Sequence, residues 1–312
     1  MAIPTLPHQT TDLFLTGGGT ETWLMYKRGL ELEEFSAFHL LHDAKAKAAL
    51  HEYYRTFAEV AVRYGASFIF DSLTYRASRD WGRLLGYNDS RLAEMNHACF
   101  ELYRGAARAA GLPASKTVIS GCIGPKGDAY KLDQALTAEG AKVYHSEQIA
   151  TFKAGGAHIA TALTLNTTAE AIGIARAAQT ANLPSVISFT LEKNRCLRSG
   201  ESLQDAIETV DAQTGSAPAY YMINCAHPVD FGPALTRGAW SDRIHGLRAN
   251  ASTLDHGTLC QLGHLEEGNP DELAAQYADI RRRFPTMNVF GGCCGTDFVH
   301  VDKIASALHA PL

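Results

Sequence analysis

Residues 288–296 read NVFGGCCGT, a short apolar run that passes directly into glycines and paired cysteines. After it, apolar side chains recur every three or four positions, as one face of a helix requires: Val301, Ile304, Ala305 and Leu308. A buried strand followed by a loop and an amphipathic helix is the repeating unit of parallel α/β folds. The stretch therefore predicts such a fold, with Cys293 and Cys294 at the carboxyl end of a strand.

The same unit recurs along the chain. Short β-branched or apolar runs predict eight strands, at Leu13–Thr16, Ser67–Asp71, Thr117–Gly121, His158–Leu163, Ser185–Thr190, Tyr220–Asn224, Arg243–Leu247 and Asn288–Phe290. Helical stripes lie between them, at residues 50–61, 92–106, 171–178, 203–210 and 273–280, and Thr167-x-x-Glu170 is typical of a capping box. Eight such units in 312 residues predict a single (β/α)8 TIM barrel, with residues 1–312 as one domain. The alternative is an open doubly wound sheet, but no G-x-G-x-x-G motif follows the first strand.

The composition limits the kinds of partner. The chain has 28 basic and 33 acidic side chains and a net charge of −5, whereas nucleic-acid-binding domains are usually basic. No apolar run approaches the roughly 20 residues of a membrane span, and the first residues carry no secretory signal. We therefore expect a cytoplasmic protein with small-molecule partners and no nucleic-acid or membrane partner; the sequence leaves the oligomeric state unknown.

Three of the seven cysteines are predicted to hold a metal ion. Cys225 follows the strand predicted to end at Asn224, and two βα units separate it from Cys293 and Cys294. In a barrel, both strands end at the face where active sites lie, so the three sulfurs can converge. Three thiolates with an open fourth position are typical of a catalytic Zn²⁺, and we assign no catalytic residue beyond this metal site. We expect the other cysteines to serve in packing: Cys99, Cys122, Cys196 and Cys260.

Such a metal suits chemistry at sulfur. Zinc deprotonates a coordinated thiol, and three protein thiolates leave the ion electron-rich, so a bound substrate thiolate stays nucleophilic. Alkyl transfer to sulfur therefore fits better than hydrolysis, for which His and Glu ligands are usual. His227 is expected in a supporting position beside the ligands. Asn224 either offers its amide oxygen to the metal or the substrate, or serves as a turn residue.

These motifs together resemble the homocysteine S-methyltransferase family, of the zinc-dependent, cobalamin-independent, single-barrel type. The most specific is GGCCGT at 291–296, and the others are Asn224-Cys225, YHxxQI at 144–149 with Ala154-Gly155, and ISFT at 187–190. The resemblance covers nearly the whole chain. It implies a zinc TIM barrel that transfers a methyl group from a sulfonium, betaine or folate donor to homocysteine, with Cys225, Cys293 and Cys294 as metal ligands.

The chain departs from the family pattern at two acidic positions. Thr16-Gly17-Gly18 stands where the family has Asp-Gly-Gly, and Leu163 stands at the end of strand four, where the family has Glu. Both acidic groups would pair with the ammonium of homocysteine, and a missing charge partner in a buried site is destabilising. Either another carboxylate replaces them (Glu21, Asp71 or Glu192), or the acceptor is a different thiol or selenol. The predicted substrate-binding residues are Gly17, Gly18, Glu21, Asp71, Ser188, Phe189, Thr190 and Asn224.

The leading hypothesis is direct methyl transfer to a zinc-bound thiol. The donor is a small cation, S-methylmethionine or a similar sulfonium or betaine, and the acceptor is homocysteine, which gives methionine. Two long loops, Gly124–Gly140 and Thr253–Asn269, are expected as lids over the barrel mouth. The alternatives are a zinc hydrolase or lyase, and a zinc- or thiol-binding barrel without methyl-transfer turnover. Four aromatic residues either face the cationic donor or pack in the core: Trp23, Tyr26, Tyr75 and Phe189.

Overall fold

A closed barrel of eight parallel strands forms the centre of the protein. The computed structural model describes residues 4–132 and 136–309. The strands follow one another around the barrel in chain order, and the last pairs with the first. This confirms the predicted TIM barrel and excludes the open sheet. The strands are β1 (Phe14–Thr16), β2 (Ser67–Phe70), β3 (Thr117–Ile123), β4 (Ile159–Leu165), β5 (Ser185–Phe189), β6 (Pro218–Asn224), β7 (Ile244–Ala249) and β8 (Val289–Gly292).

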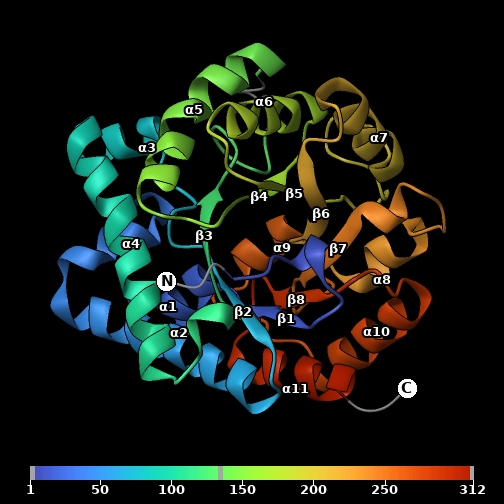
Figure 1. Cartoon of the computed structure of the whole chain (residues 1–312). Coiled ribbons are helices and arrows are strands. Elements are labelled where there is room, and N and C mark those ends of the chain that lie inside the picture. The colour runs from blue at the N-terminus through green and yellow to red at the C-terminus, as the bar shows by residue number, and fades with distance from the viewer. Residues whose placement is uncertain (1–3, 133–135, 310–312) are drawn as a thin grey trace.

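Helices surround the strands as a ring, and α9 lies over the middle of the barrel in the view of Figure 1. The predicted helical stripes fall on helices, and the side chain of Thr167 caps α6 by accepting the backbone N–H of Glu170 (3.3 Å). Within the described ranges, no helix is long and apolar enough to cross a membrane. The helices are α1 (Thr20–Arg28), α2 (Ala44–Arg63), α3 (Arg79–Leu84), α4 (Asp89–Ala109), α5 (Ala138–Ala154), α6 (Thr168–Thr180), α7 (Leu203–Thr214), α8 (Pro228–Phe231), α9 (His256–Gln261), α10 (Pro270–Arg283) and α11 (Phe298–His309).

Several strands extend further toward their carboxyl ends than the sequence predicts. The sequence places the end of β7 at Leu247, whereas the strand continues through Arg248 to Ala249. A charged residue ordinarily marks the end of a buried strand, but Arg248 is only 2% exposed and remains inside the barrel. Its charge must therefore have a buried partner.

The barrel interior is packed near the amino ends of the strands. A compact cluster there contains Phe14, Ile69, Val118, Ile159, Val186, Tyr220, Met222 and Val289. A larger cluster fills the space between the strands and the helices, with Leu15, Phe68 and Phe70 among its members. Because the amino end is filled, room for a ligand is left toward the carboxyl ends of the strands, where barrel enzymes bind their substrates.

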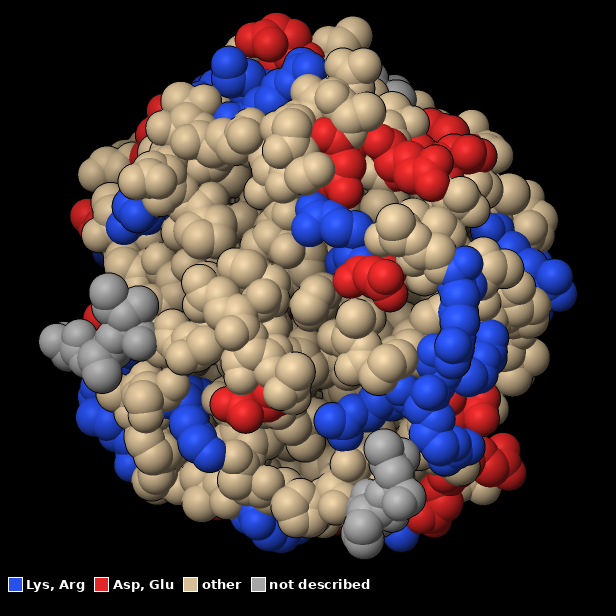
Figure 2. All heavy atoms as spheres, turned by 45° about the vertical axis from the view of Figure 1, so that its right-hand side comes forward, with Lys and Arg blue, Asp and Glu red and all other residues tan. Residues whose placement is uncertain are grey.

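The outer surface carries charges of both signs, and Figure 2 shows basic and acidic side chains lying side by side on one face. Some of them form exposed ion pairs, such as Arg282 with Asp279 (3.0 Å) and Lys303 with Asp271 (2.8 Å). Exposed pairs of this kind usually contribute less than about 1 kcal/mol to stability. They are therefore a reference against which a buried ion pair can be judged.

Candidate metal and substrate site

The order of the strands brings Cys225 and Cys293 together. They follow β6 and β8, which lie on either side of β7. The backbone N–H of Cys225 donates to the carbonyl of Arg248 (3.1 Å), and that of Cys293 donates to the carbonyl of Ala249 (2.8 Å). The two Cα atoms consequently lie 5.5 Å apart despite a separation of 68 residues.

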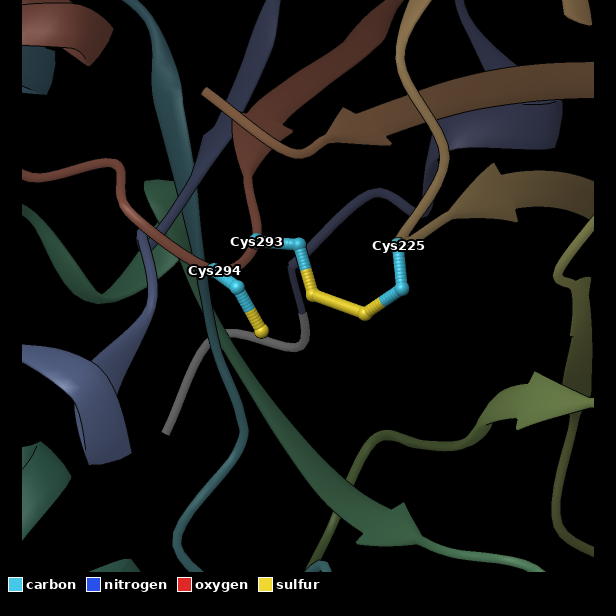
Figure 3. A group of neighbouring side chains, drawn as sticks. All are labelled: Cys225, Cys293 and Cys294. Carbon is cyan, nitrogen blue, oxygen red and sulfur yellow. A yellow bond between two sulfur atoms is a disulfide. The ribbon is translucent and has the colours of Figure 1, made fainter. Parts of the chain in front are cut away.

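Three sulfur atoms meet at this point. Those of Cys225, Cys293 and Cys294 all lie within 4.8 Å of one another. The first two are joined as a disulfide, and the side chain of Cys294 extends from the next position of the same loop (Figure 3). Metal ligation needs thiolates, so the bonded pair is the oxidised form of this cluster.

The reduced donor set fits zinc. With Zn–S bonds of about 2.3 Å, tetrahedral geometry would place the sulfurs roughly 3.8 Å apart, so the three side chains are near enough to hold one ion once the bond between Cys225 and Cys293 is reduced. Cys225, Cys293 and Cys294 would hold the ion, and its remaining ligand would come from the adjoining cavity.

Unusual backbone conformations create this cluster. Cys225 adopts a φ of +53°, in the left-handed region, which turns the chain out of the strand direction directly after β6. Gly292 has no room for a side chain, because an added Cβ would lie 2.0 Å from the hydroxyl oxygen of Thr296. That hydroxyl donates to the carbonyl of Cys293 (2.7 Å) and holds the cysteine loop in place. The GGCCGT motif therefore specifies the backbone conformation of this loop as well as its two thiols.

Asn224 supports the sulfur of Cys225. Its side-chain amide donates to that sulfur (3.2 Å), while its amide oxygen accepts the backbone N–H of Thr164 (2.8 Å) and the hydroxyl of Ser188 (2.6 Å). The amide oxygen is therefore engaged within the protein. The sequence predicts either an amide oxygen offered to the metal or the substrate, or a turn residue; the donation of the amide to the sulfur of Cys225 is a contact that it does not predict.

A buried ion pair stands beside the cluster. The guanidinium of Arg248 donates to the carboxylate of Asp71 (2.8 Å), and both side chains are at most 3% exposed. The hydroxyl of Thr16 also donates to Asp71 (3.3 Å), and Nε of Arg248 donates to the carbonyl of Gly292 (3.1 Å). The pair therefore ties together the ends of β1, β2, β7 and β8. The sequence does not single out Arg248; the carboxylate after the second strand is the signal that could have found it.

A cavity of about 430 Å³ adjoins the three cysteines. Both predicted lid regions contribute to its wall, through Tyr130 of the β3–α5 loop and through Leu259 and Glu266 of the β7–α10 segment. Residues 133–135 of the first region and the side chains of His256 and Cys260 in the second lie outside the described part of the structure. The loops are therefore placed at the mouth, as the sequence predicts.

The three candidate carboxylates lie in different surroundings. Asp71 is held by Arg248, and Glu192 pairs with Arg198 (2.8 Å) at a partly exposed position. Glu21 lines the cavity, and burial raises the pKa of its carboxyl to about 7. Of the three, Glu21 is the one placed to meet a ligand.

The other predicted residues divide between the cavity wall and the layer behind it. Gly18 and Leu163 line the cavity. Gly17 accepts the backbone N–H of Gly292 through its carbonyl (2.9 Å), and the hydroxyl of Thr190 donates to the carbonyl of Cys225 (3.4 Å). These two residues consequently hold the cysteine segments in position.

The predicted aromatic residues separate in the same way. Tyr26 and Tyr75 line the cavity, where they could face a cation. Trp23 packs on Tyr53 with ring centres 4.7 Å apart, and Phe189 stacks on Tyr221. Two of the four aromatic residues therefore belong to the core.

Of the remaining cysteines and histidines, Cys99 and Cys122 are buried, Cys196 is half-buried, and Cys122 also lines the cavity. His227 caps α8, where its Nδ1 accepts the backbone N–H of Val229 (3.3 Å). These side chains lie outside the three-sulfur cluster.

A closed parallel barrel with thiols gathered at the carboxyl ends of its strands defines a TIM-barrel enzyme with a candidate thiolate metal site. The chain belongs to the homocysteine S-methyltransferase family, whose model matches residues 14–308, and it is a methyltransferase. This confirms the resemblance that the GGCCGT motif indicates.

Solved structures agree on the fold. The oxidised form of the homocysteine methyltransferase MmuM from Escherichia coli has a TM-score of 0.75 and 19% identity, covering 97% of this chain and 99% of that one. Its metallated form has a TM-score of 0.72 and 19% identity, covering 96% of each chain. No curated protein sequence matches the chain.

Proposed function

We propose that this protein is a zinc-dependent methyltransferase that moves a methyl group from a small cationic donor to the thiol of homocysteine. The observation that carries the proposal is the convergence of three sulfurs within 4.8 Å beside a cavity, in a chain of this family. In this proposal Cys225, Cys293 and Cys294 hold the zinc. The reaction is assigned to residues 1–312 as one domain.

The site is arranged to keep sulfur anionic. Zinc bound by three thiolates would lower the pKa of a substrate thiol at its fourth position and keep that thiolate nucleophilic. The amide of Asn224 donates to the sulfur of Cys225 and so stabilises the thiolate form of this side chain. The guanidinium of Arg248 lies at the same end of the barrel, where the carboxylate of Asp71 balances its charge.

The transfer itself conserves atoms and electrons. The thiolate sulfur of the acceptor attacks the methyl carbon of the donor, the donor's bond to that methyl breaks, and its electron pair returns to the donor atom. A sulfonium and a thiolate thereby become two neutral thioethers. Because opposite charges disappear, a cavity with apolar walls favours the step, and here Leu163, Met25 and Cys122 contribute to those walls.

The donor and the acceptor follow from the family and from this charge balance. S-methylmethionine, or a similar sulfonium or betaine, is the proposed donor. Homocysteine is the proposed acceptor, although Thr16 and Leu163 stand where the family carries acidic residues. A different thiol or selenol is the second candidate, favoured by the uncharged side chain of Leu163 in the cavity wall.

The test is a product screen with reduced, zinc-loaded protein. Homocysteine and other thiols are each combined with a panel of methyl donors, and mass spectrometry identifies the methylated product. We expect methionine from homocysteine with a sulfonium donor. Methylation of another thiol but not of homocysteine would identify that thiol as the acceptor. Turnover without any thiol would indicate a hydrolase or lyase. Thiol binding without turnover would indicate a binding protein.

Two cysteine variants test the metal site separately. Cys293→Ala and Cys294→Ala should lose zinc and methyl transfer while the barrel stays folded, because these side chains lie at the mouth and not in the core. Cys99→Ala is the control: Cys99 is buried on α4, and its loss should leave the zinc content at wild-type level. Full zinc retention and turnover in both mouth variants would refute the assignment.

A further inference from the structure

We propose that Glu21 and Arg76 together recognise the ammonium and carboxylate groups of an α-amino acid bound in the cavity. The inference rests on the proposed function, because the amino acid is one of the two reactants. It assigns to Arg76 a binding role that neither the sequence motifs nor the family pattern indicates.

Arg76 lies at the cavity, and part of its guanidinium has no hydrogen-bond partner among the described residues. It follows β2, lines the cavity, and stacks on the ring of Trp81 at 4.1 Å. Nη1 donates to the carbonyl of Glu34 (2.7 Å), which fixes the plane of the group. Nε is buried and has no hydrogen-bond partner among the described residues. A buried donor without a partner is unfavourable, so a small rotation of the guanidinium that brings this edge to a carboxylate in the cavity is favoured.

Another arginine of the protein, Arg243, binds a carboxylate through the same Nε–Nη2 edge of its guanidinium. In Arg243, Nε and Nη2 grip the two carboxylate oxygens of Asp211, at 2.8 and 3.0 Å. Such two-point contacts are the preferred way for arginine to hold a carboxylate. The same edge of Arg76 therefore fits the carboxylate of a ligand.

Glu21 supplies the complementary charge. It lies in the first turn of α1 and lines the same cavity as Arg76. The two residues line the same cavity and interact electrostatically but form no ion pair with each other, so each can take a ligand group as its partner. The carboxylate of Asp71 cannot take this role, because Arg248 already neutralises it.

Opposite charges in one cavity favour a zwitterion as the ligand. A ligand with a carboxylate and an ammonium on one carbon can satisfy both groups, whereas an amine or an acid alone satisfies one. Homocysteine and S-methylmethionine share this head group. Either molecule can therefore bind here through its head group, and the experiment below distinguishes homocysteine from S-methylmethionine.

The test compares complete and truncated reactants in Arg76→Gln and Glu21→Gln. For the acceptor, 3-mercaptopropylamine lacks the carboxylate of homocysteine and 4-mercaptobutyrate lacks its ammonium. For the donor, dimethyl(propyl)sulfonium lacks both groups of S-methylmethionine. Losing a hydrogen bond to a charged group should raise KM for the complete reactant roughly 10- to 100-fold. Arg76→Lys, which keeps the charge, should recover part of the loss.

The truncated reactants identify the contact. If the acceptor is held here, Arg76→Gln changes KM for homocysteine but not for 3-mercaptopropylamine, and Glu21→Gln spares 4-mercaptobutyrate in the same way. If the donor is held here, the variants change KM for S-methylmethionine but not for dimethyl(propyl)sulfonium. Equal effects on complete and truncated reactants, or no effect on either, would overturn the inference.

Two further measurements keep this inference separate from the proposed function. Zinc content should be unchanged in both variants, and calorimetry should show weaker binding of the complete amino acid even where turnover is absent. Arg91→Gln and Glu94→Gln are matched controls, because they remove the same groups from an exposed pair on α4. Wild-type protein that binds neither amino acid would overturn the inference; binding without methyl transfer would overturn only the proposed function.

Discussion

Removing the guanidinium of Arg248 should destabilise the barrel more than the loss of any exposed charge. In Arg248→Met the carboxylate of Asp71 stays buried, with hydroxyl donors remaining from Ser72 (2.9 Å) and Thr16 (3.3 Å). The carbonyl of Gly292 also loses its donor. Breaking a buried ion pair from one side costs about 3–5 kcal/mol, because a charge without its partner remains in a poorly solvated region.

The melting temperature gives this loss a measurable size. The entropy of unfolding is roughly 2.1 cal/mol/K per residue, or about 0.66 kcal/mol/K for 312 residues, so Tm should fall by roughly 5–8 °C. Scanning calorimetry should use reduced, metal-free protein, because a bound ion would stabilise the folded state of each variant to a different extent.

Two comparisons isolate the buried charge. The double variant Asp71→Asn/Arg248→Met should melt higher than Arg248→Met, because no uncompensated charge remains in it. Arg282→Met breaks the exposed pair with Asp279 and should cost at most about 1 kcal/mol. The reasoning is refuted if Arg248→Met melts within about 2 °C of the wild type, or if the double variant is less stable than the single one.

Gly292→Ala should weaken metal binding and leave the helices intact, because the new Cβ would displace the Thr296 hydroxyl that holds the cysteine loop. Competition with a chelator measures this, and unchanged affinity would contradict the packing argument. Thr16→Asp should lower stability and fail to improve homocysteine binding, because a second carboxylate would then lie beside Asp71. Urea unfolding and a binding isotherm check both effects; tighter binding at full stability would show the reasoning to be wrong. Burial raises the pKa of Glu21 to about 7, so this carboxyl gains its charge as the pH rises through that value. Binding of methionine to metal-free protein should therefore strengthen by up to about tenfold from pH 6 to pH 8 by calorimetry, and a profile as flat as that of Glu21→Gln would count against it.

The fold could be predicted from the sequence because its signals are local. Each strand is a short apolar run, each helix a stripe with a period near 3.6, and the alternation of the two leaves few topologies open. The position of the cysteines also follows from topology alone. A residue directly after β6 and one directly after β8 must both lie at the carboxyl end of the barrel, whatever their side chains do.

The charged side chains of the site could not be predicted in the same way. Arg248 and Asp71 are 177 residues apart, and no periodic pattern connects them. In the sequence an arginine within an apolar run indicates the end of a strand, and its partner becomes visible only when the barrel is closed. The free edge of Arg76 depends in turn on Glu34, in a segment outside the predicted strands and helices.

The contrast between Asp71 and Glu21 shows how the same chemical group acquires two roles at one barrel end. A guanidinium and two hydroxyls surround the carboxylate of Asp71, so it can orient the strand ends but has little left to offer a ligand. Glu21 is desolvated by burial and forms no such ion pair, and its pKa is raised as a result. A cationic group of a ligand in the cavity would stabilise the charged form of Glu21, and this stabilisation would contribute to binding. Glu21, the carboxylate without a cationic partner of its own, is therefore the one that can select a ligand.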